Sequence, residues 1–337
     1  SRNLIAAADF ISSLGYEEAE EIESILDQAQ KKIYEVTNFS DIHKFVELKH
    51  ELDEAWERLD KLHNSAEGLR GVPTGFQAMD DMLSGFQKSD LIILAARPSM
   101  GKTSLALDIA RQAAVLHNIP VGIFSLEMSS QQLVDRMLAA QSNVDAWRLR
   151  TGKLSKENDF ESIRQSLDVL AKAPIFIDDQ PGNNILKMRS VARRLKNERG
   201  LGMIVVDYLQ LMMTTKNYDS MVNQVTEISR SLKNLARELD VPVLALSQLS
   251  RAVEQRGGKP KLSDLRDSGS IEQDADVVMF IHREDKSNRV DEADKTNIAE
   301  ILIEKHRNGA TGKVDLFFNE KKATFQSLEK AEFTGAE

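Results

Sequence analysis

The strongest constraint on this sequence is an apolar run that ends in a short loop of small residues and leads into a helical pattern. The run and loop read LIILAARPSMGKT over Leu91–Thr103, and the spacing of a helix continues from Ser104 to His117. A strand, a loop and a helix in this order form a phosphate-binding loop, where backbone N–H groups and the helix N-terminus surround phosphates. We therefore expect the chain to bind a nucleotide.

Each chemical part of such a loop has a residue in this sequence. Lys102 is placed to reach the β and γ phosphates, and the Thr103 hydroxyl to ligate Mg²⁺. The other loop residues expected at the nucleotide are Arg97, Pro98, Ser99, Met100, Gly101 and Ser104. The usual pattern has glycine six residues before the lysine, where this chain has Ala96. An ordinary strand-to-helix turn is the alternative interpretation.

The composition excludes several other classes of chemistry. The 337 residues include no cysteine, which excludes disulfides, thiol catalysis and cysteine-ligated zinc, and the six histidines lack metal-ligand spacing. Mg²⁺ with the nucleotide is therefore the only metal we expect. No apolar stretch is long enough to span a bilayer and no signal region opens the chain, so we expect a cytoplasmic protein without a membrane partner. The net charge of −9 argues against a broad basic coat but allows a local basic lining.

From about Gly71 onward, short apolar runs alternate with helical patterns. This alternation predicts an α/β fold with a mostly parallel sheet flanked by helices. The expected strands are Leu91–Ala96, Val121–Leu126, Ile175–Ile177, Met203–Val206, Val241–Leu246, Val277–Ile281, Ile301–Ile303 and Val314–Phe318. Ligands of such sheets bind beyond the carboxyl ends of the strands, so residues that follow each run are the candidates for chemistry.

Two helices are expected upstream of this region. Apolar residues recur at helical spacing over Glu17–Val36 and again over Asp41–His63, and Asn64–Thr74 has the composition of a linker. Two helices alone make a poor core. We expect the Ile22, Ile25, Ala29 and Ile33 stripe to pack either on the domain that follows or on a neighbouring subunit.

Acidic and amide side chains follow the expected strands. Glu127 could polarise an attacking water, Asp207 could support Mg²⁺, and Gln248 could sense the γ-phosphate. For either acid alone, a solvated strand end or a helix cap is the alternative. Lys305 and Arg307 lie two residues apart, on one side of an extended segment, and form a candidate cationic finger; a charged hairpin is the alternative.

One further segment suits contact with a nucleic-acid backbone. Residues Leu262–Asp276, LSDLRDSGSIEQDAD, place Arg266, Asp267 and Gly269 in an expected polar loop. Backbone N–H groups, a glycine and an arginine can hold phosphates without reading bases. A second exposed loop is expected over Met212–Asn223, and either loop could also be an ordinary surface segment.

Taken in order, these motifs resemble the RecA-like motor domain of DnaB-type bacterial replicative helicases. The resemblance covers Gly71 to Arg307 and includes AARPSMGKT, VGIFSLEMSSQQLVDRML, MIVVDYLQLM, ALSQLSR, LRDSGSIEQDADVVMFIHR and IEKHRNG. It accounts for Ala96, because the family's phosphate loop commonly reads this way. It implies a helical linker region over 1–66, a RecA-like ATPase domain over 67–337, and a missing globular N-terminal domain.

The resemblance implies a homohexameric ring that hydrolyses ATP at subunit interfaces and moves 5′ to 3′ on single-stranded DNA, unwinding duplex. It makes Glu127 the catalytic base, Asp207 a Mg²⁺ support, Gln248 the sensor and Arg136 a nucleotide contact. Lys305 and Arg307 would reach the neighbouring subunit's ATP. Arg266, Asp267 and Gly269 would hold DNA in the central channel, and a primase and a helicase loader are candidate partners.

Two other interpretations remain open from the sequence. A RecA-type recombinase or a clock-type ATPase would use the same fold, and these predict strand exchange or slow turnover. A non-motor ATP-binding scaffold or loader would lack hydrolysis stimulated by DNA. The LRDSGSIEQDAD and KHRNG segments favour a helicase over a recombinase or clock-type ATPase. The presence of both Glu127 and Asp207 argues against a non-motor scaffold or loader.

Overall fold

The fold was analysed in a computed structural model of the chain. The structure describes residues 2–16, 22–37, 48–49, 52, 55–57, 60, 70–154, 156–180, 182, 184–214, 220–249, 258–284 and 296–328. Most of the second expected helix, Asp41–His63, therefore lies outside the described residues. None of the described helices is both long and apolar enough to cross a membrane.

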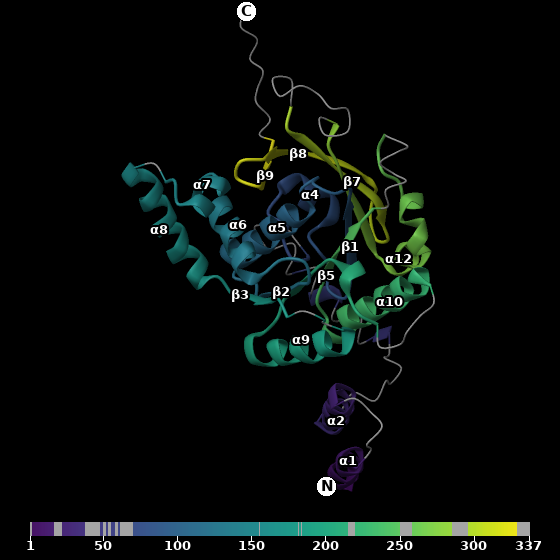
Figure 1. The fold of residues 1–337 in the computed structure, drawn as a ribbon. Helices are drawn as coiled ribbons and strands as arrows, with labels where there is room; N and C mark the ends of the chain where they lie inside the picture. Colours follow the sequence, from purple (N-terminus) through teal and green to yellow (C-terminus); the bar gives the residue numbers. More distant parts are fainter. Residues whose placement is uncertain are drawn as a thin grey trace, which may run out of the picture.

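A nine-stranded sheet in the order β3-β2-β4-β5-β1-β6-β7-β8-β9 forms the centre of the molecule (Figure 1). Its strands are β1 Leu91–Ala96, β2 Val121–Ser125, β3 Ile175–Asp178, β4 Met203–Asp207, β5 Val243–Gln248, β6 Val277–His282, β7 Ile298–His306, β8 Gly312–Asn319 and β9 Thr324–Ser327. All pairs from β3 to β6 are parallel, whereas β6, β7, β8 and β9 pair antiparallel. The mostly parallel sheet is confirmed, and β9 is an addition that the sequence did not predict.

Helices cover both faces of the sheet, which explains why β1 is buried along its whole length. Ile92 and Leu94 face a core that includes residues of α4, α5 and α6, and Leu91 and Ile93 face one that includes residues of α9, α10 and α12. The described helices of this domain are α4 Gln77–Leu83, α5 Lys102–His117, α6 Ser130–Ser142, α7 Ala146–Thr151, α8 Lys156–Lys172, α9 Ile185–Arg199, α10 Met221–Leu239 and α12 Gly269–Asp274, with short 3₁₀ turns η1 Leu209–Leu211 and η2 Leu262–Ser268.

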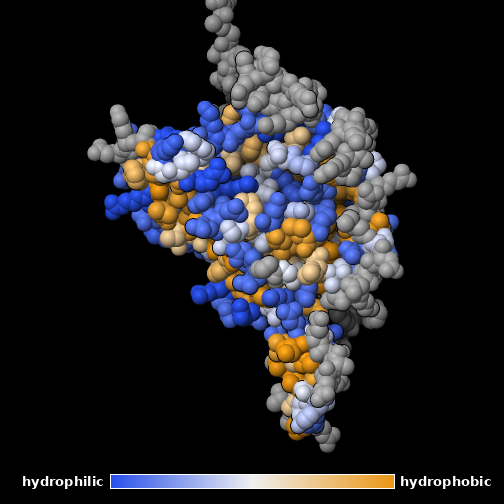
Figure 2. Space-filling model, viewed as in Figure 1, coloured by the Kyte–Doolittle hydropathy of each residue, from blue (hydrophilic) through white to orange (hydrophobic). Residues whose placement is uncertain are grey.

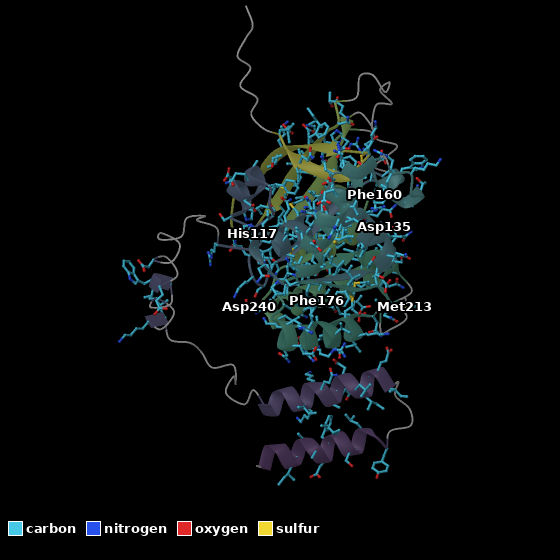
Figure 3. All side chains as sticks on the ribbon, turned by 90° about the vertical axis from the view of Figure 1, so that its left-hand side faces the viewer. His117, Asp135, Phe160, Phe176, Met213 and Asp240 are labelled. Carbon is cyan, nitrogen blue, oxygen red and sulfur yellow. The ribbon has the colours of Figure 1, made fainter. Side chains whose placement is uncertain are left out.

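Two further helices, α1 Arg2–Leu14 and α2 Ile22–Thr37, lie side by side below α9 (Figures 1 and 3). α2 meets α9 through polar side chains: Asp27 lies 3.8 Å from Arg193, and Gln30 accepts a hydrogen bond from Ser190 at 2.8 Å. Ile22 and Ile33 remain exposed, whereas Ile25 and Ala29 are half-buried. The contact with the following domain therefore uses the polar side of α2. Apolar surface remains on the part of the molecule that α1 and α2 form (Figure 2).

Candidate functional site

The phosphate loop connects β1 to α5 at the carboxyl edge of the parallel strands. Ser99 and Gly101 have positive φ angles of 63° and 96°, so the chain turns sharply just before the helix. A Cβ atom at Gly101 would lie 3.0 Å from the Phe325 ring and 3.2 Å from the Phe318 ring, which leaves little room for any larger residue. No side chain of the described residues caps the N-terminus of α5, so its first N–H groups are available to an anion.

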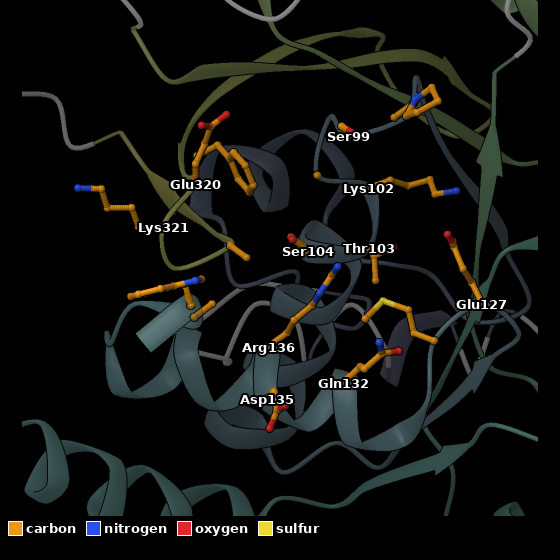
Figure 4. Close-up of a pocket in the computed structure, with 18 of the residues that line it drawn as sticks. Ser99, Lys102, Thr103, Ser104, Glu127, Gln132, Asp135, Arg136, Glu320 and Lys321 are labelled. Atoms are coloured by element: carbon orange, nitrogen blue, oxygen red, sulfur yellow. The ribbon is translucent and has the colours of Figure 1, made fainter. Parts of the chain in front are cut away.

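Lys102 and Glu127 face each other across the inner part of the site (Figure 4). The Lys102 ammonium lies 4.5 Å from the centre of the Tyr208 ring, the residue after Asp207. Burial lowers the pKa of Lys102, although the carboxylates of Asp207 and Glu127 oppose this shift. Glu127 is exposed just beyond β2, so it is accessible to water in the cleft that the lysine also lines.

Thr103 and Asp207 form the second part of the inner site. The Thr103 hydroxyl donates a 2.7 Å hydrogen bond to Asp207 Oδ2, while the buried Oδ1 has no hydrogen-bond partner among the described residues. Burial raises the pKa of Asp207, and the Thr103 bond and the charges of Lys102 and Arg136 oppose that rise. A buried carboxylate oxygen beside a hydroxyl suits a hydrated Mg²⁺ that is also held by phosphates. No cluster of three or more His, Cys, Asp or Glu in the described part of the chain offers another metal site.

Lys102, Thr103 and Glu127 line one cleft of about 820 Å³, large enough for a nucleoside triphosphate, and the buried Asp207 lies behind Thr103. Of the expected nucleotide contacts, all but Met100 line it; the Met100 side chain is buried in the core, so only its backbone could contribute. Arg136, on α6, points toward the phosphate loop (Figure 4). Gln248 also lines the cleft at the end of β5, and its backbone N–H and C=O both bond to the Gln210 side chain.

The outer wall of the cleft consists of residues that sequence reasoning missed. They come from α7 and its N-cap and from the turn between β8 and β9, and they are Asp145, Ala146, Trp147, Arg150, Glu320, Lys321 and Ala323. The Ala146 N–H donates to the Lys321 carbonyl at 2.9 Å, which ties the two segments together. No motif marks these residues. An aromatic residue between Asp145 and Arg150 is the one signal that could have drawn attention to them.

Lys305 and Arg307 do not line this cleft. β7 runs antiparallel to β6, so its end lies beside the start of β6, at the edge opposite the phosphate loop. Lys305 donates to the carbonyls of Glu272 and Ala275 at 2.6 Å each, and the Arg307 guanidinium lies 3.1 Å from Asp276. Within one chain, neither cation can reach the Lys102 site.

The expected DNA-contacting segment is helical rather than a loop. It forms η2 and α12, and the fully buried Ile271 anchors it to the core. Most residues of this segment are polar, so its composition alone indicated a loop, although the apolar side chain of Ile271 packs in the core. The side chains of Arg266 and Asp267 and the surroundings of Gly269 are not described, and residues 215–219 of the second expected loop lie outside the described residues.

Comparisons with known proteins agree with this geometry. The family model of the DnaB-like helicase C-terminal domain matches residues 71–327. The chain is 50% identical over 331 residues to the replicative DNA helicase DnaB of Geobacillus stearothermophilus and 47% identical to the replicative DNA helicase DnaC of Bacillus subtilis; both matches cover 98% of this chain and 72% of the relative.

Two solved structures are similar as well. One, described as an ATPase domain, has a TM-score of 0.79 at 36% identity, covering 85% of this chain and all of that one (100%). A DnaB-like replicative helicase, described with its primase interactions, has a TM-score of 0.82 at 33% identity, covering 97% of this chain and 76% of that one. The RecA-like fold class is thereby confirmed.

Proposed function

Because the chain belongs to the DnaB-like helicase family, it is a replicative DNA helicase, and we propose that it works as a hexameric ring that hydrolyses ATP with Mg²⁺. Each site would lie between two subunits, and each ring would move 5′ to 3′ on single-stranded DNA. The observation that carries the ATP assignment is that Lys102, Glu127 and Thr103 line one triphosphate-sized cleft, with Asp207 hydrogen-bonded to Thr103 behind it.

The described residues divide the work of phosphoryl transfer to water. Lys102 and the N-terminus of α5 would hold the β and γ phosphates, and Glu127 would orient the attacking water. Mg²⁺, held by Thr103 and through the free oxygen of Asp207, would supply positive charge that the phosphates need. Arg136 and Gln248 would contact the same nucleotide from α6 and β5.

The placement of Arg307 supports a site shared between subunits. It lies at the opposite edge of the sheet from Lys102, with its side chain 54% exposed, so it can serve only a nucleotide bound to another copy. A ring in which each protomer presents this edge to the next satisfies that requirement. Lys305, two residues earlier, would approach the same nucleotide.

We further propose that the segment from Arg266 to Gly269 contacts the DNA backbone in the ring's channel. It precedes α12, whose C-terminal carbonyls bond to Lys305, so the DNA segment and the proposed finger share one structural unit. A primase and a loader are proposed partners; one similar structure is described with primase interactions. Such an enzyme would act in the cytoplasm, where bacterial DNA is replicated.

A mixing experiment tests the shared site. Arg307→Ala and Lys102→Ala should each be inactive alone, but mixed rings contain interfaces where an intact Lys102 meets an intact Arg307. We expect partial ATPase activity to return in the mixture. If mass measurements show mixed rings but no ATPase activity returns, either Arg307 works within its own subunit or the ring needs every site intact. Diluting Arg307→Ala into wild-type rings separates these two explanations, because strict coordination predicts a loss of ATPase activity steeper than the fraction of Arg307→Ala subunits.

A further inference from the structure

A buried carboxylate lies directly behind Arg307. Asp276 is 3% exposed and sits just before β6, between the start of β1 and the end of β7. Its Oδ1 lies 3.1 Å from Nη1 of Arg307, and its backbone carbonyl accepts a 2.8 Å bond from the Arg307 N–H. The same residue therefore holds both the backbone and the head group of Arg307.

Asp276 is itself fixed from the other side. Its Oδ2 accepts a 2.8 Å bond from the Leu91 N–H at the start of β1 and forms an ion pair with Lys233 on α10. Lys233 also donates to the Ser89 carbonyl at 2.8 Å. β1, α10 and β7 thus meet at one carboxylate, on the side of the molecule where Figure 1 shows β7, α10 and α12 close together.

The hydrogen bond to Asp276 orients the Arg307 guanidinium and leaves its other N–H donors available. A guanidinium carries five N–H donors in a rigid fork, so one bond from Nη1 leaves donors for a phosphate. Asp276 also adds negative charge to a corner that holds several cations: Lys233 contacts it directly, and burial and the charge of Arg307 both lower the pKa of Lys305. The carboxylates of Asp90, Glu272 and Asp274 act in the same corner, but no hydrogen bond among the described contacts joins them to Arg307. Without the Asp276 carboxylate, the Arg307 guanidinium would lose its hydrogen-bonded counter-charge.

We propose that Asp276 is a positioning residue for Arg307, setting the guanidinium at the angle from which it meets the neighbouring subunit's nucleotide. The inference rests on the proposed trans role of Arg307 and adds a residue that contacts no nucleotide in either subunit. Asp276 is too deeply buried to touch a ligand, so its effect on hydrolysis would pass entirely through Arg307.

The first test is Asp276→Asn, which keeps the shape of the side chain and removes its charge. A displacement of about 1 Å at a catalytic group lowers rates on the order of 100-fold, and we expect kcat for ATP to fall by that order with KM nearly unchanged. Adding the change to Arg307→Ala should not lower the small residual kcat of that variant any further, because the group that Asp276 positions is already gone. A multiplied loss in the double variant would overturn the inference.

Asp90→Asn is the matched control. Asp90 is a second buried aspartate in the same corner, close enough for the charges of Asp276 and Arg307 to affect its pKa, but no hydrogen bond joins it to Arg307 among the described contacts. The same aspartate-to-asparagine change should leave kcat near the wild-type value. An equal fall in both variants would indicate that general disruption of this corner, rather than positioning of Arg307, lowers the rate.

Mixing gives the decisive readout, because a merely structural defect would not depend on the partner. Asp276→Asn should regain activity when mixed with Lys102→Ala, as Arg307→Ala should, but not when mixed with Arg307→Ala, since every interface then lacks a working finger. If Arg307→Ala with Lys102→Ala also fails, the shared-site proposal is at fault. If that pair succeeds and Asp276→Asn with Lys102→Ala does not, the present inference is wrong.

A folding failure is handled by a second variant. Asp276→Asn leaves the half-buried Lys233 without its direct ion-pair partner, which can destabilise the domain. Lys233→Met with Asp276→Asn removes both charges together, and the melting temperature of each variant identifies which to use. We expect the double replacement to regain ATPase activity when mixed with Lys102→Ala but not when mixed with Arg307→Ala. Failure to regain activity with Lys102→Ala, where Arg307→Ala does regain it, would overturn the inference.

Discussion

Replacing Asp90 with asparagine should stabilise the protein in a strongly pH-dependent way. Asp90 is buried just before β1, and burial together with the nearby charge of Asp276 raises its pKa from 3.8 to about 6. Because the folded pKa lies above the unfolded one, the native state holds an extra proton between these values and stability falls as pH rises through this window. Ionising Asp90 therefore works against folding at neutral pH.

The size of the effect follows from the shift. A difference of roughly 2 pKa units at about 1.4 kcal/mol per unit destabilises the native state by about 3 kcal/mol at pH 8, and by about half of that at pH 5, where Asp90 is mostly protonated. Asp90→Asn removes this contribution at every pH. Its advantage over wild type should therefore grow by between 1 and 2 kcal/mol, as an order of magnitude, from pH 5 to pH 8.

Urea unfolding at a series of pH values, followed by far-ultraviolet circular dichroism, measures this difference. Asp240→Asn is the control, because Asp240 lies exposed at the same edge, bonded to Ser89 at 2.9 Å. That variant should track the wild-type pH profile. A difference between Asp90→Asn and wild type that stays constant from pH 5 to pH 8 would refute the account of this corner.

Three further outcomes follow from the nucleotide and DNA assignments. Lys102→Ala should keep its fold and lose ATP hydrolysis, because it removes the charge facing the β and γ phosphates; near-normal turnover in a folded variant would contradict the phosphate-loop assignment. Glu127→Gln should still bind ATP, measured by calorimetry, but lose turnover, since an amide orients water poorly; loss of binding would point to a structural role. Arg266→Ala should weaken single-strand binding across sequences and flatten its salt dependence, and unchanged binding at several salt concentrations would rule out that contact.

Local patterns predicted the strands and the inner site because both depend on neighbours in the sequence. Runs such as Met203–Val206 became β4 nearly as expected, and the residues that follow them met at one edge because parallel strands end together. Strand direction, by contrast, depends on which partner a strand finds. Nothing in the pattern of Ile301–Ile303 distinguishes parallel from antiparallel pairing, so the pattern alone could not show at which edge of the sheet Lys305 and Arg307 lie.

The contacts that the sequence could not predict join residues far apart in the chain. Asp276 bonds to the Leu91 N–H, 185 positions away, and Asp108 bonds to the Phe325 N–H, 217 positions away. The second pair joins α5, which follows the phosphate loop, to β9. The ring of Phe325 on β9 packs against Gly101. No periodicity encodes such pairs, because burial and bonding are decided only when the sheet order is set.

The most direct test of the central claim is the ATPase rate with and without single-stranded DNA, together with the mass of the protein in solution with ATP and Mg²⁺. We expect a mass near that of six chains and hydrolysis that rises when DNA is added, with both the basal and the stimulated rate abolished by Lys102→Ala. A ring that binds ATP but hydrolyses it at one low rate with or without DNA would contradict a DNA-driven motor and favour a non-motor ATPase of the same fold.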